Sequence, residues 1–311
     1  MAASAVSIII TSYNQESYLR EAIDSALNQT TRPHEIIVAD DHSTRDNSVA
    51  LIRDYESRFP GLVRGVFQEE NVFIPRNRNA ALATVTSEFV TMLDGDDRLL
   101  PNFIERHLAA LATNPRAGCS YSNRYVMSPT GEHLRVHSNA PKPSGNIFAL
   151  VARGETGILR TLVARIDLIR AAGFLDPECR HHDGYILSLR LAKTTEFVYI
   201  PEPLMEKREH SGGTSRGTSP AKKSRSQQRA FEETIMLSAD LPRRERKAIA
   251  WQWYWNMLEA SVMTLAEAGE RPRAYAALAA ALVRSPTRRR IRNIAEFARK
   301  IARGEIGIDR S

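Results

Sequence analysis

The stretch Phe89-Val-Thr-Met-Leu-Asp94-Gly95-Asp96-Asp97 decides how the rest of this chain is interpreted. Its apolar residues suffice for one buried strand, which ends abruptly in three carboxylates. Carboxylates this close repel one another unless a cation or an array of donors lies beside them. Because open α/β sheets bind ligands at the carboxyl ends of their strands, the stretch indicates a divalent-metal site that holds phosphates. An acidic turn before a helix that begins near Pro101 is the competing interpretation.

Length and composition indicate an ordinary globular protein. The 311 residues allow one large α/β unit with an appendage, and the 42% hydrophobic and 25% charged content is typical of soluble chains. Nothing approaches the run of about 18 apolar residues that a membrane helix needs. The Val6–Ile10 run is too short for a signal peptide and leads into polar residues, so we expect the first strand of a cytoplasmic protein. Cys119 and Cys179 are too few for a disulfide framework, so we expect both to be reduced.

Short apolar runs alternate with amphipathic stretches through residues 1–115. This alternation predicts βαβ units and a mainly parallel α/β sheet flanked by helices. We expect strands near residues 6–12, 34–40, 62–68, 88–94 and 118–126, and helices near residues 17–29, 46–58, 76–86 and 101–113. Residues 128–157 lose this period and gain proline, glycine and serine, which predicts a loop-rich excursion lining an acceptor site. Regular elements are expected again after this excursion. They are an apolar segment at 157–163, helices at 167–172 and 183–193, and a strand at 196–200.

The C-terminal region differs from the rest in composition. A segment rich in glycine, serine, threonine and lysine at 212–223 predicts a linker, so we expect one domain at 1–216 and a basic helical region at 217–311. Residues 221–311 hold 19 Lys and Arg against 10 Asp and Glu, a balance of +9, whereas the whole chain carries +7. The difference leaves −2 for residues 1–220. We expect helices in the tail near residues 225–239, 243–268, 271–284 and 287–303.

Polar groups follow the predicted strands at the edge of the sheet where ligands bind. After the first strand, Tyr13 can stack on a base and Thr11 can bond phosphate or ribose, or the segment forms a simple turn. After the second strand, the Asp41 carboxylate suits an N–H or hydroxyl donor on a base or ribose, and a helix N-cap is the alternative. Arg78 opens a predicted helix, where the helix dipole disfavours a cation. It therefore indicates an anionic partner, or a salt bridge to one of the strand-end acids Asp40 and Asp94.

Downstream residues add three further candidates. Asp183 opens a helix anchored by apolar positions, either as a functional carboxylate or as a cap. His210, which follows Arg208 by two positions, can ligate a metal or bond phosphate, although isolated histidines are usually structural. The adjacent His181 and His182 lack the helical spacing of a zinc motif, so we do not expect a zinc site.

The order of these segments resembles the family-two glycosyltransferases of the GT-A fold. The resemblance spans residues 5–216 and rests on Val6–Asn14, Glu35–Asp41, Arg78-Asn79, Asp94–Asp97, Arg190–Ala192, Pro201–Leu204, and Arg208 with His210. It implies a Rossmann-like GT-A sheet and an enzyme that inverts the anomeric carbon. Such an enzyme moves a hexosyl or related sugar from a nucleotide-diphosphate donor to a hydroxyl of a saccharide or lipid-linked acceptor. We therefore expect a role in polysaccharide or glycoconjugate assembly.

The resemblance also assigns roles by position. Asp41 resembles a base contact, and Thr11 and Tyr13 resemble nucleotide contacts. Asp94 and Asp96 form the D-x-D pair, with Asp96 as the direct ligand of Mg²⁺ or Mn²⁺. The remaining expectations are that Arg78 and Arg208 bind the nucleotide sugar, that His210 joins the metal, and that Asp183 is the catalytic base.

Two departures from the family pattern leave other classes open. The family places a glycine where this chain has His42. A strict count back from Arg190 puts Asp183 on the position of a family glutamate and Gly184 on that of the base. A catalytically silent GT-A-like binding or scaffold protein therefore stays open. A sugar nucleotidyltransferase is disfavoured, because Ser12–Glu16 is not its Gly-rich phosphate loop.

The tail has its own pattern. Residues 287–303 combine basic residues with apolar residues at helical spacing, which predicts a basic amphipathic helix. Such a helix suits peripheral contact with the anionic inner face of a membrane. It suits equally well packing on the catalytic domain, or on a second subunit in a homo-oligomer formed through the C-terminal helices. We do not expect nucleic acid as a partner, because residues 1–220 are slightly acidic and contain no recognisable binding module.

Overall fold

The computed structural model describes residues 5–138, 140–154, 158–210 and 220–267, together with 269–270, 272–274, 276–277 and 299. The chain divides into two compact units, Met1–Arg216 and Gly217–Ser311, and each is described here by itself.

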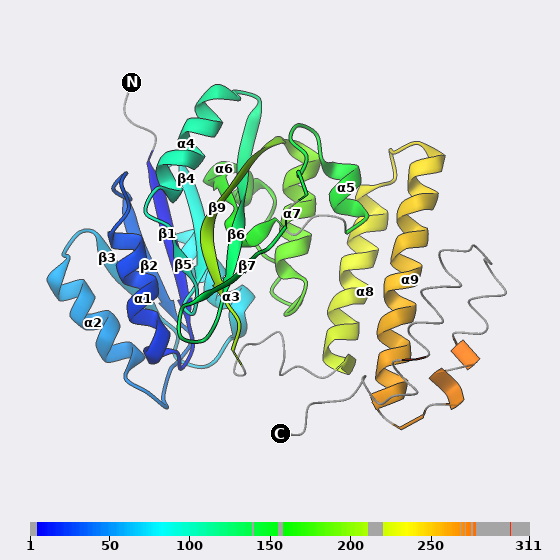
Figure 1. Ribbon diagram of the computed structural model, residues 1–311, viewed down its shortest axis with the longest axis horizontal. Coiled ribbons are helices and arrows are strands. Elements are labelled where there is room, and N and C mark those ends of the chain that lie inside the picture. The colour runs from blue at the N-terminus through cyan, green and yellow to red at the C-terminus, as the bar shows by residue number, and fades with distance from the viewer. Residues whose placement is uncertain are drawn as a thin grey trace. The chain divides into compact units, whose positions relative to one another are not determined.

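The first unit is built on one mixed sheet (Figure 1). Its strands are β1 (Val6–Ser12), β2 (Glu35–Asp40), β3 (Val63–Phe67), β4 (Phe89–Asp94), β5 (Arg98–Leu99), β6 (Ala117–Met127), β7 (His133–Val136), β8 (Val163–Arg165) and β9 (Glu196–Arg208). They lie in the order β3-β2-β1-β4-β8-β6-β9-β5, and β7 pairs with β6. The pairs β3–β2, β2–β1, β1–β4 and β6–β9 are parallel, whereas β8 runs antiparallel between β4 and β6. The α/β sheet predicted from the sequence is therefore confirmed, with antiparallel strands inserted.

Helices cover both faces of this sheet. They are α1 (Glu16–Leu27), α2 (Ser48–Arg58), α3 (Phe73–Ala83), α4 (Phe103–Thr113), α5 (Phe148–Ala152), α6 (Ile166–Ala171) and α7 (Asp183–Thr194), with a short 3-10 turn at Leu159–Thr161. Alternate residues of a strand face opposite sides, so Ile8 and Ile10 pack with the buried residues of α1, α2 and α4. Ile9 between them is also fully buried, on the face that α3 contacts. Strands buried on both sides explain the uninterrupted apolar runs in the sequence.

The parallel register brings the polar strand ends together. Thr11 on β1 pairs with Asp94 on β4, and Ser12 pairs with Asp40 on β2. Because parallel strands end at the same edge, the segments that follow β1, β2 and β4 meet there.

Some elements differ from the predicted bounds. Helix α3 begins at Phe73, three residues earlier than predicted, and Phe73 itself adopts a positive φ of 68° at the turn into the helix. Strand β9 runs to Arg208, beyond the expected residue 200, and crosses Pro201 and Pro203 where its pairing with β6 shifts register. In the described part of the segment expected at 157–163, Leu159–Thr161 form the 3-10 turn and Val163 begins β8.

The second unit contains α8 (Pro220–Leu237) and α9 (Arg243–Glu267). Trp253 is buried and lies 6.1 Å from Phe231, centroid to centroid, whereas Trp251 and Trp255 form an edge-to-face pair at 5.9 Å. The helix predicted at 287–303 lies outside the described residues except at position 299, and the one at 271–284 is described only in part. None of the described helices is long and apolar enough to cross a membrane.

Candidate active site

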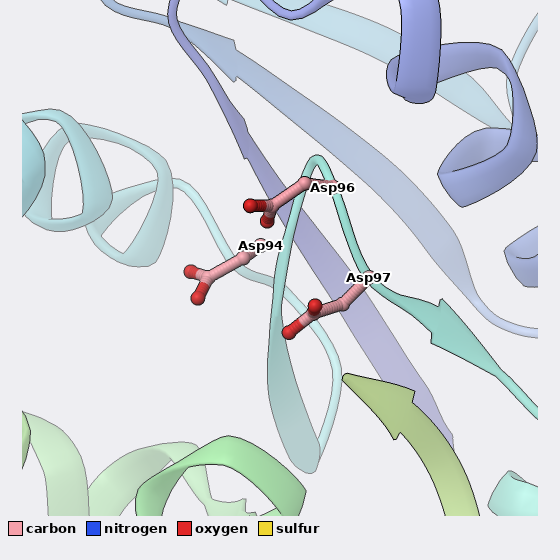
Figure 2. Close-up of side chains that lie close together, drawn as sticks. All are labelled: Asp94, Asp96 and Asp97. Atoms are coloured by element: carbon pink, nitrogen blue, oxygen red, sulfur yellow. The ribbon is translucent and has the colours of Figure 1, made fainter. Parts of the chain in front are cut away.

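Three carboxylates converge where β4 ends (Figure 2). One ligating oxygen each from Asp94, Asp96 and Asp97 lies within 4.8 Å of the others. Gly95 makes this turn possible, because a Cβ at that position would stand 2.7 Å from the main-chain oxygen of Thr11. Its N–H donates to the same oxygen at 2.8 Å, so the acidic turn is fastened to the end of β1.

Two arginines neutralise part of the negative charge of the acidic turn. Arg160, from the 3-10 turn, donates from Nη1 to Asp94 Oδ2 at 2.6 Å and to Asp97 Oδ2 at 3.0 Å. Arg78, on α3, pairs with the other oxygen of Asp94. The salt bridge between Arg78 and Asp94 that the sequence offered as one alternative is therefore present. Sequence reasoning missed Arg160, whose only signal was a cation inside an otherwise apolar segment.

The three acids are not electrostatically equivalent. Burial works to raise the pKa of Asp94, but the charges of Arg78 and Arg160 outweigh it and hold that pKa below the usual range. Burial, together with the charges of Asp94 and Asp96, raises the pKa of Asp97 to about 8. Asp97 is almost wholly enclosed, with 1% of its side chain exposed, whereas Asp94 and Asp96 retain 24% and 15%. Asp94 and Asp96 are thus the two carboxylates that a bound ion can reach.

This donor set fits a hard divalent cation. Mg²⁺ and Mn²⁺ are bound by oxygen ligands, commonly one or two carboxylates completed by substrate phosphates. Burial, and after it the charges of Asp94 and Asp96, raises the pKa of Asp97, so the three carboxylates still repel one another beside the two arginines. A dication beside the turn relieves that repulsion.

His210 lies directly beside the turn. Its Nε2 is 2.8 Å from Asp96 Oδ2, and its ring packs against Tyr18 with the centroids 5.0 Å apart. The two residues predicted as metal ligands, Asp96 and His210, are therefore neighbours in space although 114 positions separate them in the chain.

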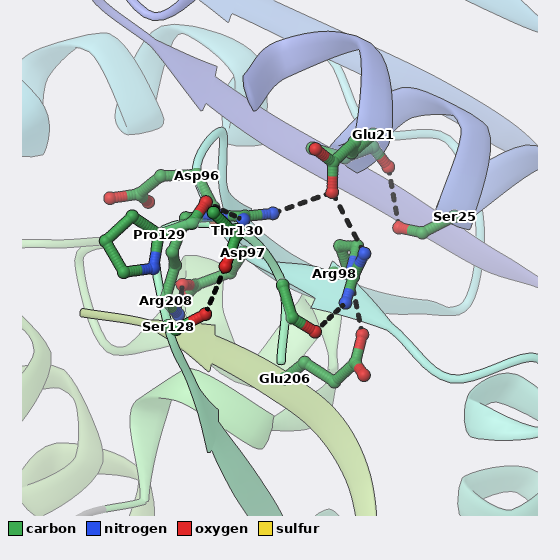
Figure 3. Close-up of polar contacts among 12 residues, drawn as sticks. Glu21, Ser25, Asp96, Asp97, Arg98, Ser128, Pro129, Thr130, Glu206 and Arg208 are labelled. Atoms are coloured by element: carbon green, nitrogen blue, oxygen red, sulfur yellow. Dashed lines mark hydrogen bonds and ion pairs between the residues drawn. The ribbon is translucent and has the colours of Figure 1, made fainter. Parts of the chain in front are cut away.

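Arg208 is buried, and it lies beside the acidic turn with a contact to Glu21 (Figure 3). Its guanidinium donates to Glu21 Oε2 at 2.7 Å, to the main-chain oxygen of Pro129 at 2.7 Å and to that of Asp96 at 3.0 Å. Its main-chain N–H donates to Asp97 Oδ1 at 2.9 Å. With 1% of its side chain exposed, Arg208 fixes the acidic turn to α1 and β9 and does not line the cavity.

A cavity of about 290 Å³ opens beside these acids. Its lining residues are Arg78, Met92, Asp94, Arg124, Ile158, Arg160, His181, His182, Asp183, Gly184, Tyr185, Ser188 and Met205. This cavity is thus lined by functional groups from three segments that are distant in sequence. They are α3, the end of β4 and the start of α7.

Asp183 is the first residue of α7 and lines this cavity. Its Oδ2 lies 3.6 Å from Arg78 Nη1, and that oxygen accepts no hydrogen bond. Burial raises the pKa of Asp183, although the charge of Arg78 opposes the shift. A carboxylate that is desolvated and has an oxygen without a hydrogen bond is a stronger base than one in water.

The residues expected to hold the nucleotide lie at the ends of β1 and β2. Tyr13 is 41% exposed, so its ring is available for stacking, and Thr11 is buried at the strand end. Asp41 accepts the N–H of Val72 at 2.7 Å, and burial raises its pKa. His42, which stands where the family has glycine, adopts a positive φ of 63°, the conformation that glycine favours.

The sequence comparison adds independent information to this geometry. Residues 7–161 match the family described as Glycosyl transferase family 2. The chain belongs to that family. The chain is 36% identical to an uncharacterized glycosyltransferase of Nostoc sp., over 47% of this chain and 45% of that protein. It is 30% identical to the chondroitin synthase of Pasteurella multocida, over 44% of this chain and 14% of that protein. The match thus spans less than half the length of these curated relatives.

Solved structures agree on the fold of this family 2 glycosyltransferase. The crystal structure of S. aureus TarS 1-349 in complex with UDP superposes with a TM-score of 0.62 at 16% identity, covering 96% of this chain and 92% of that one. The same protein in complex with UDP-GlcNAc gives a TM-score of 0.60 at 15% identity. At this level of identity the likeness shows a GT-A fold.

Proposed function

We propose that the protein transfers a sugar from a nucleoside-diphosphate donor to an acceptor hydroxyl, with a divalent cation and with inversion at the anomeric carbon. The observation that carries this proposal is the position of Arg78, which contacts Asp94 on one side and Asp183 on the other inside one cavity. Asp94, on the proposed leaving-group side, and Asp183, the proposed base, are thus separated by a single arginine side chain.

The proposed reaction is a single displacement. The acceptor oxygen attacks the anomeric carbon of the sugar, and the bond from that carbon to the diphosphate oxygen breaks. The electron pair of that bond stays on the nucleoside diphosphate, while Asp183 accepts the proton of the attacking hydroxyl. General-base catalysis of this kind contributes roughly 10²–10⁴-fold.

Asp94, Asp96 and His210 are the residues proposed to hold Mg²⁺ or Mn²⁺. When bound, such an ion neutralises the charge that develops on the departing diphosphate. Arg78 adds a fixed positive charge at the same place. Arg208 supports the site by holding the acidic turn in shape.

We propose the ends of β1 and β2 as the nucleoside site, with Tyr13 against the base and Asp41 close to it. The TarS structures contain UDP and UDP-GlcNAc, so a uridine diphosphate sugar is the first donor to test. We propose a saccharide or lipid-linked acceptor, which places the enzyme in polysaccharide or glycoconjugate assembly. Residues 1–216 are the proposed catalytic domain, with 217–311 as a separate helical region.

A panel of nucleotide sugars tests the proposal directly. Melting temperature is measured with each donor, with and without Mn²⁺, and donors that stabilise the protein are then incubated to measure release of nucleoside diphosphate. We expect one class of donor to raise the melting temperature only with the metal, and to be consumed. Stabilisation without any turnover, by hydrolysis or transfer, would instead support the silent binding protein.

A further inference from the structure

Four cations from separate segments lie near one another, and one of them lines the cavity. They are Arg124 on β6, Arg135 on β7, Lys142 in the segment after β7 and Lys207 on β9, and we call them the basic cluster. The strand register brings three of them together, because Val126, two residues after Arg124 on β6, pairs with Arg135 on one side and with Lys207 on the other.

His137 lies among the four cations. Its Nε2 is 3.0 Å from Arg124 Nη2, and since an arginine can only donate, the histidine must accept with a lone pair. Burial and the charges of all four cations lower the pKa of His137 to about 4, so it stays neutral at physiological pH. The histidine therefore adds no positive charge and serves as a neutral acceptor for Arg124.

The basic cluster has too few carboxylates to balance it. Glu209 is shared between Arg135, at 3.2 Å, and Lys207, at 3.8 Å. Across the part of the chain that the structure describes, no carboxylate oxygen lies within 4.0 Å of the charged nitrogens of Arg124 or Lys142. These two cations differ in this respect from Arg78 and Arg160, which are paired with acids.

Within the basic cluster, the burial of Arg124 is energetically the least favourable. It is only 8% exposed, it lines the cavity, and its buried Nε has no hydrogen-bond partner. Burial, together with the charge of Arg160, lowers the pKa of Arg124 to about 10. A buried cation with an unused donor is unfavourable unless an anion completes its surroundings.

The segment that carries Lys142 is fastened to the sheet. Asn123 Nδ2 donates to the main-chain oxygen of Ser138 at 2.7 Å, and the Tyr121 hydroxyl donates to that of Pro143 at 2.5 Å. The Tyr199 N–H donates to the Ser144 hydroxyl at 2.9 Å. The main chain on both sides of Lys142 is therefore held against β6 and β9, and the charge of Arg124 acts on Lys142, as a preformed binding site requires.

The order of the strands separates the basic cluster from the proposed nucleoside site. Strand β6 lies on the far side of β4 and β8 from β1 and β2, which carry Tyr13 and Asp41 at their ends. Arg124 and Asp183 line the same cavity. Arg124 thus lies away from the proposed nucleoside site and in the same cavity as the proposed base.

We propose that the acceptor carries an anionic group, a phosphate or a carboxylate, which binds to Arg124 and Lys142 while the attacking hydroxyl points toward Asp183. This inference rests on the proposed function, because it identifies the class of acceptor for the same site. Phosphate and carboxylate share the oxygen acceptors that arginine and lysine recognise, and Arg124 can donate to either from its fork of N–H groups. A neutral sugar would leave both cations unpaired.

Binding of small probes to metal-free protein tests this inference without turnover. Glycerol 1-phosphate, glycerate and glycerol are titrated by calorimetry into the wild type, Lys142→Met, Arg124→Met and the control Arg116→Met. Arg116 is 84% exposed and pairs with Glu196 at 3.4 Å. We expect at least one anionic probe to bind the wild type and the control, with affinity reduced about tenfold or more in Lys142→Met, the loss expected for one charge-assisted hydrogen bond. Glycerol should not bind, and the tighter of the two anions identifies the acceptor group.

A second titration, with UDP and Mg²⁺ at saturation, separates the two sites. The anionic probe should still bind, because the acceptor and donor sites are distinct. Displacement of the probe by UDP would assign the basic cluster to the donor and overturn the inference, as would equal binding by the wild type and Lys142→Met. Failure of UDP and Mg²⁺ to bind at all would count against the proposed function instead, since probe binding is measured without nucleotide. Lys142 is only half-buried, so its variant remains informative if Arg124→Met does not fold.

Discussion

Arg78 and Asp183 form an ion pair, with 3.6 Å between Nη1 and Oδ2, at the point where α3 and α7 meet the acidic turn. The same arginine also contacts Asp94, so one guanidinium sets the charge on both sides of the cavity. This relationship couples the proposed base to the proposed metal site. The charge of Arg78 also opposes the effect of burial on the pKa of Asp183.

Asp183→Asn is expected to lower turnover by about 10²-fold or more while nucleotide binding is retained, because the amide cannot accept the proton. Steady-state kinetics gives turnover, and thermal shift with UDP and Mn²⁺ gives binding. Glu178, which is exposed and paired with Arg76, provides the matched control as Glu178→Gln. Near-normal turnover in Asp183→Asn would move the base to another residue, with His182 the first to test.

The pH dependence of Asp183 has a definite sign. Its pKa is raised in the folded protein, so its contribution to stability is present below the unfolded pKa of about 4 and is lost as pH rises through the folded value. Asp183→Asn should therefore melt at the same temperature as the wild type or higher at pH 7, and the advantage should vanish near pH 4. The wild-type kcat/KM should rise with pH across the range in which Asp183 loses its proton. A variant that melts far below the wild type at pH 7 would contradict the raised pKa.

Asp96→Ala is expected to abolish transfer and to remove the stabilisation that donor and Mn²⁺ give together. The protein without ligands should stay folded, because the Asp96 side chain hydrogen-bonds only His210 among the described residues. Thermal melting and transfer assays measure both effects. Unfolding of the unliganded variant would favour a purely structural acidic turn, and full activity of the wild type in EDTA would exclude a metal mechanism.

Arg160→Met removes the cation that bridges Asp94 and Asp97. Arg160 retains 34% exposure while Asp97 is enclosed, so we expect a fall in the free energy of unfolding that is smaller than the about 3–5 kcal/mol for a fully buried pair. Because a divalent ion can neutralise the same carboxylates, Mn²⁺ should restore more stability to this variant than to the wild type. Arg165→Met, which removes a half-exposed pair with Glu88, is the control and should lose no more than about 1 kcal/mol. Equal stabilisation of both variants by Mn²⁺ would show that no ion binds at the acidic turn.

The basic C-terminal segment remains a proposed site of membrane contact. Liposomes containing anionic lipid should co-sediment with the full chain at low salt and release it at high salt, since each Lys or Arg near such a surface contributes about 1 kcal/mol. Deletion of residues 287–311 should remove the binding. Full-length protein that stays in the supernatant at low salt would favour packing on protein or on a second subunit, which sedimentation velocity would detect.

Local sequence was enough to predict the strands of the first half of the chain. The runs at 6–12 and 88–94 are apolar on both faces and end in polar groups, so β1 and β4 could be placed from hydrophobicity and turn residues alone. Asp94, Asp96, Arg78 and Asp183 could be named because each lies at the end of a predictable element. For such residues the position along the chain already implies the position at the edge of the sheet.

The tertiary structure decided which of these groups meet and what charge each one carries. Arg160 lies in a short 3-10 turn, and Arg124 lies on β6, whose pairing is irregular. Both arginines reach the cavity because β8 and β6 lie beside β4 in the sheet. The structure likewise placed Arg208 beside the acidic turn, where it donates to Glu21 and Pro129. The sequence by itself determined the residue types and the order of the elements, because periodicity and turn chemistry are local. Charge compensation and pKa depend on burial and on partners about a hundred residues away, for example the 114 positions between Asp96 and His210, and only the folded chain sets them.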